Sequence, residues 1–193
     1  MGFFDSILGR SKPPEADLDA LFAVPQAALS LGTEGFGATG VGGVCYRPTE
    51  GGAFSDTEAQ IKQLVATGGG PAIEGTTDRF GFRWLTVTRT DADVSGLVTD
   101  LHAINVSLAD AGFGSALLCS TVVFAAPAEE SSPRGRMALV YLYKRGTFYP
   151  FAPLTDERRD NALELQVRGL IAGDVTVEPD LPRWLAIWGA PGL

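Results

Sequence analysis

The sequence predicts an α+β domain in which three main helices pack on a mostly antiparallel sheet. Apolar residues recur at helical spacing in three stretches, and short runs rich in β-branched and aromatic residues lie between them, joined by short turns. Hydrophobic residues make up 45% of the chain and charged residues 20%, a balance that supports a buried core. With 193 residues, the chain is expected to form one α+β domain over residues 15–193, preceded by an amphipathic arm over residues 1–14.

The N-terminal arm carries its apolar side chains on one side of a short helix, and these are Phe3, Phe4, Ile7 and Leu8. Three destinations remain open for them: their own domain, a partner coiled coil, or shallow insertion into a membrane. A short helix is expected over residues 15–22, stopped by Pro25 because proline removes a backbone donor. The glycine-rich residues 32–43 indicate a loop, and residues 44–47 a short strand.

Two of the three main helices begin at recognisable capping residues. Ser55 and Glu58 have capping-box spacing, and so do Thr90 and Asp93, which precede six apolar residues at helical spacing. The third helix is expected over residues 156–171. Runs of β-branched and aromatic residues predict strands at residues 72–77, 82–89, 117–124, 137–143 and 147–151, the last an edge strand because it contains Pro150. The apolar tail, residues 181–193, is expected to dock on the domain.

The charge of the chain is unevenly distributed. The formal net charge is -8, but residues 134–168 hold seven basic and four acidic side chains, which leaves -11 for the rest. An acidic chain repels nucleic acid, and an anionic partner is therefore expected to contact only this basic stretch. No apolar run approaches the ~20 residues that cross a bilayer. We find no signal peptide, which predicts a cytoplasmic protein with Cys45 and Cys119 as buried thiols.

No set of residues in the sequence could run a common hydrolytic, redox or phosphoryl-transfer reaction. Residues 35–40 fit the dinucleotide pattern G-x-G-x-x-G, but a strand rather than a helix is expected after them. His102 is the only histidine, and no G-x-S-x-G sequence presents a serine nucleophile. We therefore expect a non-enzymatic protein without cofactor or metal. An unfamiliar kind of enzyme stays open, and a deep cleft lined by perturbed titratable groups would favour it.

Basic and aromatic residues alternate in the C-terminal half, as they do in protein interfaces. They are expected on an exposed hairpin and at the start of the following helix. The predicted partner-binding residues are Tyr143, Lys144, Arg145, Phe148, Tyr149, Phe151, Arg158 and Arg159. Nucleic acid is a weaker alternative because the chain is acidic and Pro150 interrupts the strand.

A second hypothesis places a small anion or metabolite in a pocket where four polar side chains converge, namely His102, Asn105, Arg145 and Arg159. The alternative is a structural role for His102 and Asn105, as a polar pair on one helix that hydrogen-bonds to loop carbonyls.

Several blocks along the whole chain resemble the actinobacterial PspAB family, the PspA-associated proteins. The resembling blocks are MGFFD (1–5), GRSK (9–12), TDLHA (99–103), GFG (112–114), LYKRGTFYPFAP (142–153), ERRDNALEL (157–165) and WGAPGL (188–193). The resemblance implies an accessory or adaptor protein of the phage-shock (envelope stress) response that associates with PspA, a coiled-coil protein at the inner membrane face. It implies no activity, cofactor or catalytic residue. Peripheral contact with the inner face of the membrane is an open alternative for the N-terminal arm.

Overall fold

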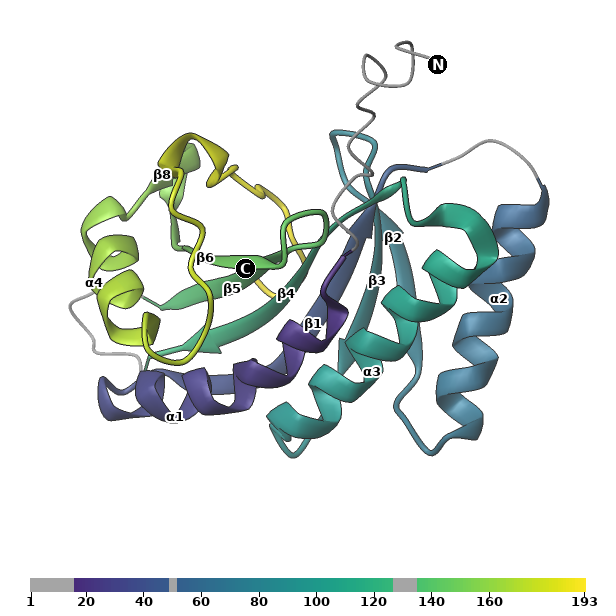
Figure 1. The fold of residues 1–193 in the computed structure, drawn as a ribbon, viewed down its shortest axis with the longest axis horizontal. Helices are drawn as coiled ribbons and strands as arrows, with labels where there is room; N and C mark the ends of the chain where they lie inside the picture. Colours follow the sequence, from purple (N-terminus) through teal and green to yellow (C-terminus); the bar gives the residue numbers. More distant parts are fainter. Residues whose placement is uncertain (1–15, 49–51, 127–134) are drawn as a thin grey trace, which may run out of the picture.

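The centre of the molecule is a six-stranded sheet with the strand order β2-β3-β1-β4-β5-β6 (Figure 1). The computed structural model describes residues 16–48, 52–126 and 135–193. Every neighbouring pair in this sheet is antiparallel, which confirms the predicted α+β class. The six strands are β1 Gly37–Tyr46, β2 Ile73–Thr77, β3 Arg83–Thr88, β4 Leu117–Ala125, β5 Arg136–Leu142 and β6 Thr147–Phe151.

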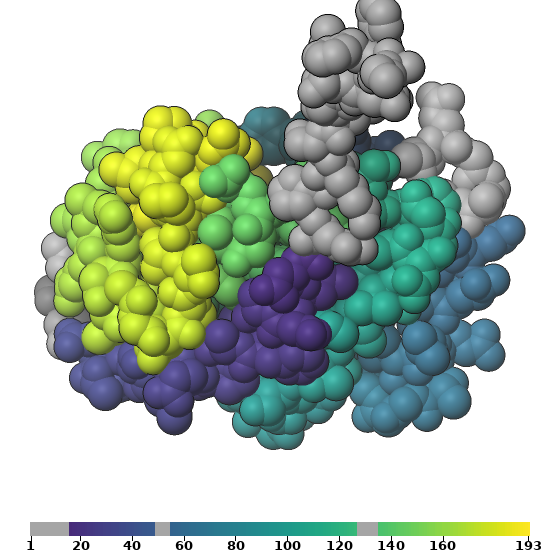
Figure 2. Space-filling model, viewed as in Figure 1, coloured from purple at the N-terminus to yellow at the C-terminus, as the bar shows by residue number. Residues whose placement is uncertain are grey.

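One face of the sheet is covered by helices, whose buried side chains form a single hydrophobic cluster with the strands. Figure 2 shows this side, with α1 in purple and α3 in teal. The described residues form four α-helices, one more than predicted: α1 Val24–Thr33, α2 Gly52–Thr67, α3 Val94–Leu108 and α4 Asn161–Ile171. The expectation that Pro25 stops a helix is wrong. Pro25 lies in the first turn of α1, where its missing N–H would have no intrahelical partner.

The glycine-rich segment is mostly strand rather than loop, because β1 already begins at Gly37. Its glycines allow a close approach of α3. A Cβ atom on Gly42 would lie 2.8 Å from the Thr121 carbonyl oxygen and 3.0 Å from Leu101 Cδ1. The segment was predicted as a loop because glycine is unfavourable in strands, but here the absence of a side chain is what the packing requires. Strand β1 also replaces the helix that a dinucleotide fingerprint needs.

Helix α4 begins five residues later than predicted. Asp156 and Glu157 have positive φ angles of 59° and 54°, which are incompatible with a helix. A short two-stranded sheet follows, formed by β7 Pro153–Leu154 and β8 Arg158–Arg159. The Asp160 side chain then accepts a hydrogen bond from the Leu163 N–H and caps α4.

The C-terminal tail docks on the domain, as predicted, and it partly covers the other face of the sheet. Trp184 is buried against a second cluster that contains side chains of β1, β3, β4, β5 and β6, while Ile187 and Trp188 are half-buried. Figure 1 shows the yellow tail near the upper end of α4, close to β8, from where it runs behind the strands of the sheet. In the described ranges, no helix is long and apolar enough to cross a bilayer.

Candidate functional site

The aromatic residues of the β5–β6 hairpin lie in the core, so the expectation that they form an exposed surface is wrong. Phe148, Tyr149 and Phe151 are at most 1% exposed and Tyr143 is 9% exposed. The edge of β6 is covered by the segment after α4: the Phe148 N–H donates to the Thr176 carbonyl (2.9 Å), and Phe148 pairs with the segment in parallel. Both faces of β6 and its outer edge are therefore covered, which explains why these aromatic rings are buried rather than exposed.

The basic residues of the predicted surface divide into two groups. Arg145 donates two hydrogen bonds to Glu178 (2.5 and 3.3 Å), although it stays 40% exposed. Arg159 is 20% exposed and forms an ion pair with Glu164 (2.9 Å). By contrast, Lys144 and Arg158 are exposed, and Arg158 has no ion pair within the described part of the chain. In Figure 2 the green β5–β6 turn reaches the surface between the yellow tail and the purple N-terminal segment.

Glu178, the partner of Arg145, is fully buried. Burial raises the pKa of this carboxyl, but hydrogen bonds from Arg145 and Thr147 outweigh that effect and hold the pKa below its usual value. The carboxylate is therefore charged in the folded protein at neutral pH, and Arg145 is largely committed to balancing it.

The alternative ligand pocket does not form, because its four residues have separate partners. His102 pairs with Asp19 (3.3 Å) and packs against the Phe22 ring, while Asn105 donates to the Leu101 carbonyl and to Ser120 Oγ. Arg145 and Arg159 are held by the ion pairs described above. The prediction that these side chains converge is wrong, since the topology distributes them over α3, the β5–β6 turn and β8.

A groove of about 320 Å³ lies beside α4 and is lined by Arg159, Asn161, Glu164, Leu165, Leu181 and Trp184. We call it the α4 groove. Leu165 and Leu181 are 51% and 47% exposed, which is high for large apolar side chains. Glu164 is buried and also accepts from the Ala152 N–H (2.9 Å), so it fixes the floor of the groove.

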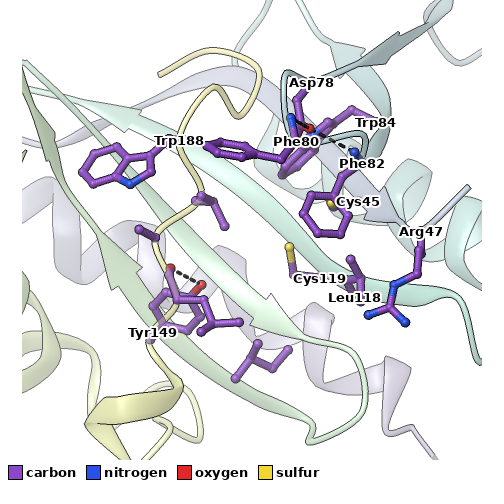
Figure 3. A pocket seen from close by; sticks show the side chains of 14 residues that line it. Cys45, Arg47, Asp78, Phe80, Phe82, Trp84, Leu118, Cys119, Tyr149 and Trp188 are labelled. Carbon is purple, nitrogen blue, oxygen red and sulfur yellow. Dashed lines mark hydrogen bonds between the residues drawn. The ribbon is translucent and has the colours of Figure 1, made fainter. Parts of the chain in front are cut away.

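A larger pocket of about 430 Å³ opens on the sheet face opposite the helices (Figure 3). We call it the thiol pocket, because Cys45 on β1 and Cys119 on β4 lie directly opposite one another on its floor. A register shift in the β1–β4 pairing makes Leu118 an extra residue, so that Leu118 and Cys119 both line the pocket. Both cysteines are free and buried, as predicted. Their adjacency was not predicted, because no sequence signal pairs β1 with β4.

Two loops form the walls of the thiol pocket. On one side, Asp78 accepts hydrogen bonds from the Phe80 and Phe82 N–H groups (2.9 Å each) and from the Trp84 indole (3.0 Å). On the other side, the tail residues 185–188 line the pocket, and the Leu185 carbonyl accepts from the Tyr149 hydroxyl (2.8 Å). The pocket is thus built from fixed groups, as small-molecule sites are.

The chemistry of the pocket is mostly apolar. A hydrogen bond with Cys119 and burial together raise the pKa of Cys45, so the thiol stays protonated at neutral pH. Such a thiol is a poor nucleophile. Within the described ranges, no group of three or more histidine, cysteine and acidic side chains is placed to hold a metal ion.

The predicted arm residues Phe3, Phe4, Ile7 and Leu8 lie outside the described residues. Comparison with known proteins gives one finding for the whole chain: the family model of PspAB, described as PspA associated protein B, matches residues 1–192. No curated protein and no solved structure matches the chain.

Proposed function

The chain belongs to the PspAB family, and we propose that it is a non-enzymatic accessory protein of the phage-shock response that associates with PspA. The family match, whose description names an association with PspA, supports this proposal. The buried Cys45 thiol, whose pKa is raised, and a histidine paired with Asp19 offer no arrangement of nucleophile and base, which favours a binding role over catalysis.

The α4 groove is the surface that best fits a helical partner. A helix from a coiled coil presents a row of apolar side chains, and it binds by placing them in a groove with apolar edges. Leu165 and Leu181 supply such edges, and their exposure of about half is the observation that carries the proposal. Arg158 adds an exposed cation one residue before Arg159 at the groove. The interface therefore combines two leucines with a basic end.

Binding to purified PspA tests this assignment. The double variant Leu165→Ser/Leu181→Ser is expected to weaken the association at least about tenfold, since each buried leucine contributes more than about 1 kcal/mol. Arg158→Glu is expected to weaken it further and to reduce its dependence on salt. Leu29→Ser is the matched control, because Leu29 is 68% exposed on α1. Wild-type affinity in both groove variants would refute the α4 groove.

The same binding measurement tests the exposed cation of the β5–β6 hairpin, Lys144. Lys144→Glu tests whether the interface extends from the groove to the β5–β6 turn, because Lys144 is exposed and its ammonium contacts only the Ser115 carbonyl (2.9 Å) in the part of the chain described. A loss of affinity with Lys144→Glu extends the interface to the hairpin. An unchanged affinity limits it to α4 and the tail.

The N-terminal arm is a second proposed contact, on either PspA or the inner face of the membrane. Its support is the apolar set Phe3, Phe4, Ile7 and Leu8, replaced together by serine in the test. Flotation of the full-length chain with liposomes is expected to decrease in the variant. Equal recovery of both proteins would exclude a membrane role for the arm.

A further inference from the structure

We propose that the thiol pocket binds a single-chain amphiphile with an anionic head group, of the fatty-acid class. The inference is independent of the association with PspA, because the thiol pocket and the α4 groove have different lining residues. The volume of the thiol pocket, about 430 Å³, lies in the range of small-molecule sites. Two further observations on the described residues define the ligand: few polar groups of the lining are available, and the arginine at the edge has no ion pair among these residues.

The lining leaves few polar groups for a ligand. Both oxygens of the Asp78 carboxylate already accept hydrogen bonds, and the Tyr149 hydroxyl donates to the Leu185 carbonyl. The remaining walls come from rings and aliphatic side chains, including Phe82, Trp84 and Ile187. A sugar or nucleotide would lose its hydration there without replacement, at a high cost per polar group. An alkyl chain loses only unfavourable contact with water.

The charge at the edge selects the head group. Arg47 is the one basic residue among the described residues that line the pocket, and it is exposed. Its guanidinium has no hydrogen bond or ion pair within the described ranges. A carboxylate matches its two parallel N–H donors, whereas a cationic head group would be repelled. Because the Asp78 carboxylate is occupied by its own loop, Arg47 is left as the charge that a ligand would meet.

The arrangement also gives the ligand a direction. Figure 3 shows Arg47 at one side of the pocket and Trp188 at the other, with Cys45 and Cys119 between them. A head group at Arg47 therefore places the alkyl chain over the two thiols and towards the tail. The two cysteines suit this position because a free, buried cysteine behaves as a small apolar side chain.

Titration of the full-length protein with dodecanoate, followed by calorimetry and by tryptophan fluorescence, tests the proposal. Trp84 and Trp188 both line the pocket, so their emission is expected to change with saturation at one ligand per chain. Dodecanoate is expected to bind at least about tenfold more tightly than dodecylamine, as one charge-assisted contact implies. Arg47→Leu should abolish that preference, while Arg168→Leu, on α4 and outside the pocket lining, should retain it.

The second variant fills the pocket with a larger side chain at Leu142, one of the lining residues. Leu142→Trp is expected to remove dodecanoate binding, and an unchanged thermal midpoint shows that the variant is folded. Bound dodecanoate should also slow alkylation of Cys119 by N-ethylmaleimide in the wild-type protein. The proposal is overturned by the absence of saturable binding, by equal affinity for the two amphiphiles, or by full binding in folded Leu142→Trp. A chain that dimerises through this face and excludes dodecanoate would overturn it as well.

Discussion

Replacing Glu58 by glutamine is expected to destabilise the protein in a pH-dependent way. Glu58 is 8% exposed on α2 and accepts hydrogen bonds from Arg83 on β3 (2.5 and 3.1 Å) and from the Tyr46 hydroxyl on β1 (3.1 Å). Lys62 adds an ion pair at 2.9 Å. Glutamine keeps the size of the side chain and removes its charge, so the substitution tests the ion pairs that join α2 to the sheet.

The pKa of Glu58 sets the magnitude. Burial raises it, but the hydrogen bonds from Arg83 and Lys62 outweigh burial and lower the pKa from 4.5 to about 2. That difference corresponds to about 3 kcal/mol. Solvent reaches the two partners, since Arg83 and Lys62 are 25% and 36% exposed, and screening reduces the contribution to about 2 kcal/mol. Because the folded-state pKa is depressed, the stabilisation is complete above pH 4.5 and is lost as the pH falls through about 2.

Urea unfolding of wild type and Glu58→Gln across this pH range measures the effect. The gap in unfolding free energy should be about 2 kcal/mol near neutral pH and should shrink steadily below pH 4.5. Glu74→Gln is the control, because Glu74 is exposed on β2 and has no ion pair among the described residues. A gap that stays constant down to about pH 2 would show that Glu58 acts through packing and refute the electrostatic reasoning.

Three further substitutions or reactions test other contacts. Gly42→Ala should lower the free energy of unfolding in urea by about 1–3 kcal/mol, because the added methyl group would lie 2.8 Å from a carbonyl oxygen. Gly37→Ala is the control and should lower it by less than about 1 kcal/mol, because the space around Gly37 is open. Alkylation of Cys45 near pH 8 should be at least about tenfold slower in the folded than in the urea-unfolded chain, because its pKa is raised; equal rates would contradict this. Arg145→Met should cost about 2 kcal/mol, since it leaves the buried Glu178 carboxylate without its counter-charge, and a loss near zero would show that the remaining hydrogen bonds suffice.

Local patterns sufficed for the fold class because strands and helices are largely determined by periodicity. The capping-box spacing of Thr90 and Asp93 correctly indicated a helix start, but the N-cap of α3 is Asp93 rather than Thr90, and its side chain accepts from the Gly96 N–H (2.9 Å). The pattern failed where one residue type has two roles. Pro25 can end a helix or begin one, and Gly42 can mark a loop or a close helix–strand contact. Only the tertiary packing distinguishes these alternatives.

The candidate sites depended on information that local patterns lack. The thiol pocket exists because β1 pairs with β4, which brings Cys45 opposite Cys119 across a long sequence separation. Likewise, the run of β-branched and aromatic residues correctly predicted β6, but not that the segment around Val177 covers its edge. A strand sequence gives the two faces of the strand and leaves open what packs on each of them.

The C-terminal tail determines how the two proposals are tested. Trp184 lines the α4 groove, and the next residue, Leu185, lines the thiol pocket. The carbonyl oxygens of both are held by the domain, Trp184 by Arg159 and Leu185 by the Tyr149 hydroxyl. A substitution of Trp184 or Leu185 would therefore alter both sites together, and loss of PspA binding and loss of amphiphile binding would become indistinguishable. Leu165 and Arg47 lie on α4 and directly after β1, outside the tail, so substitutions there separate the two functions.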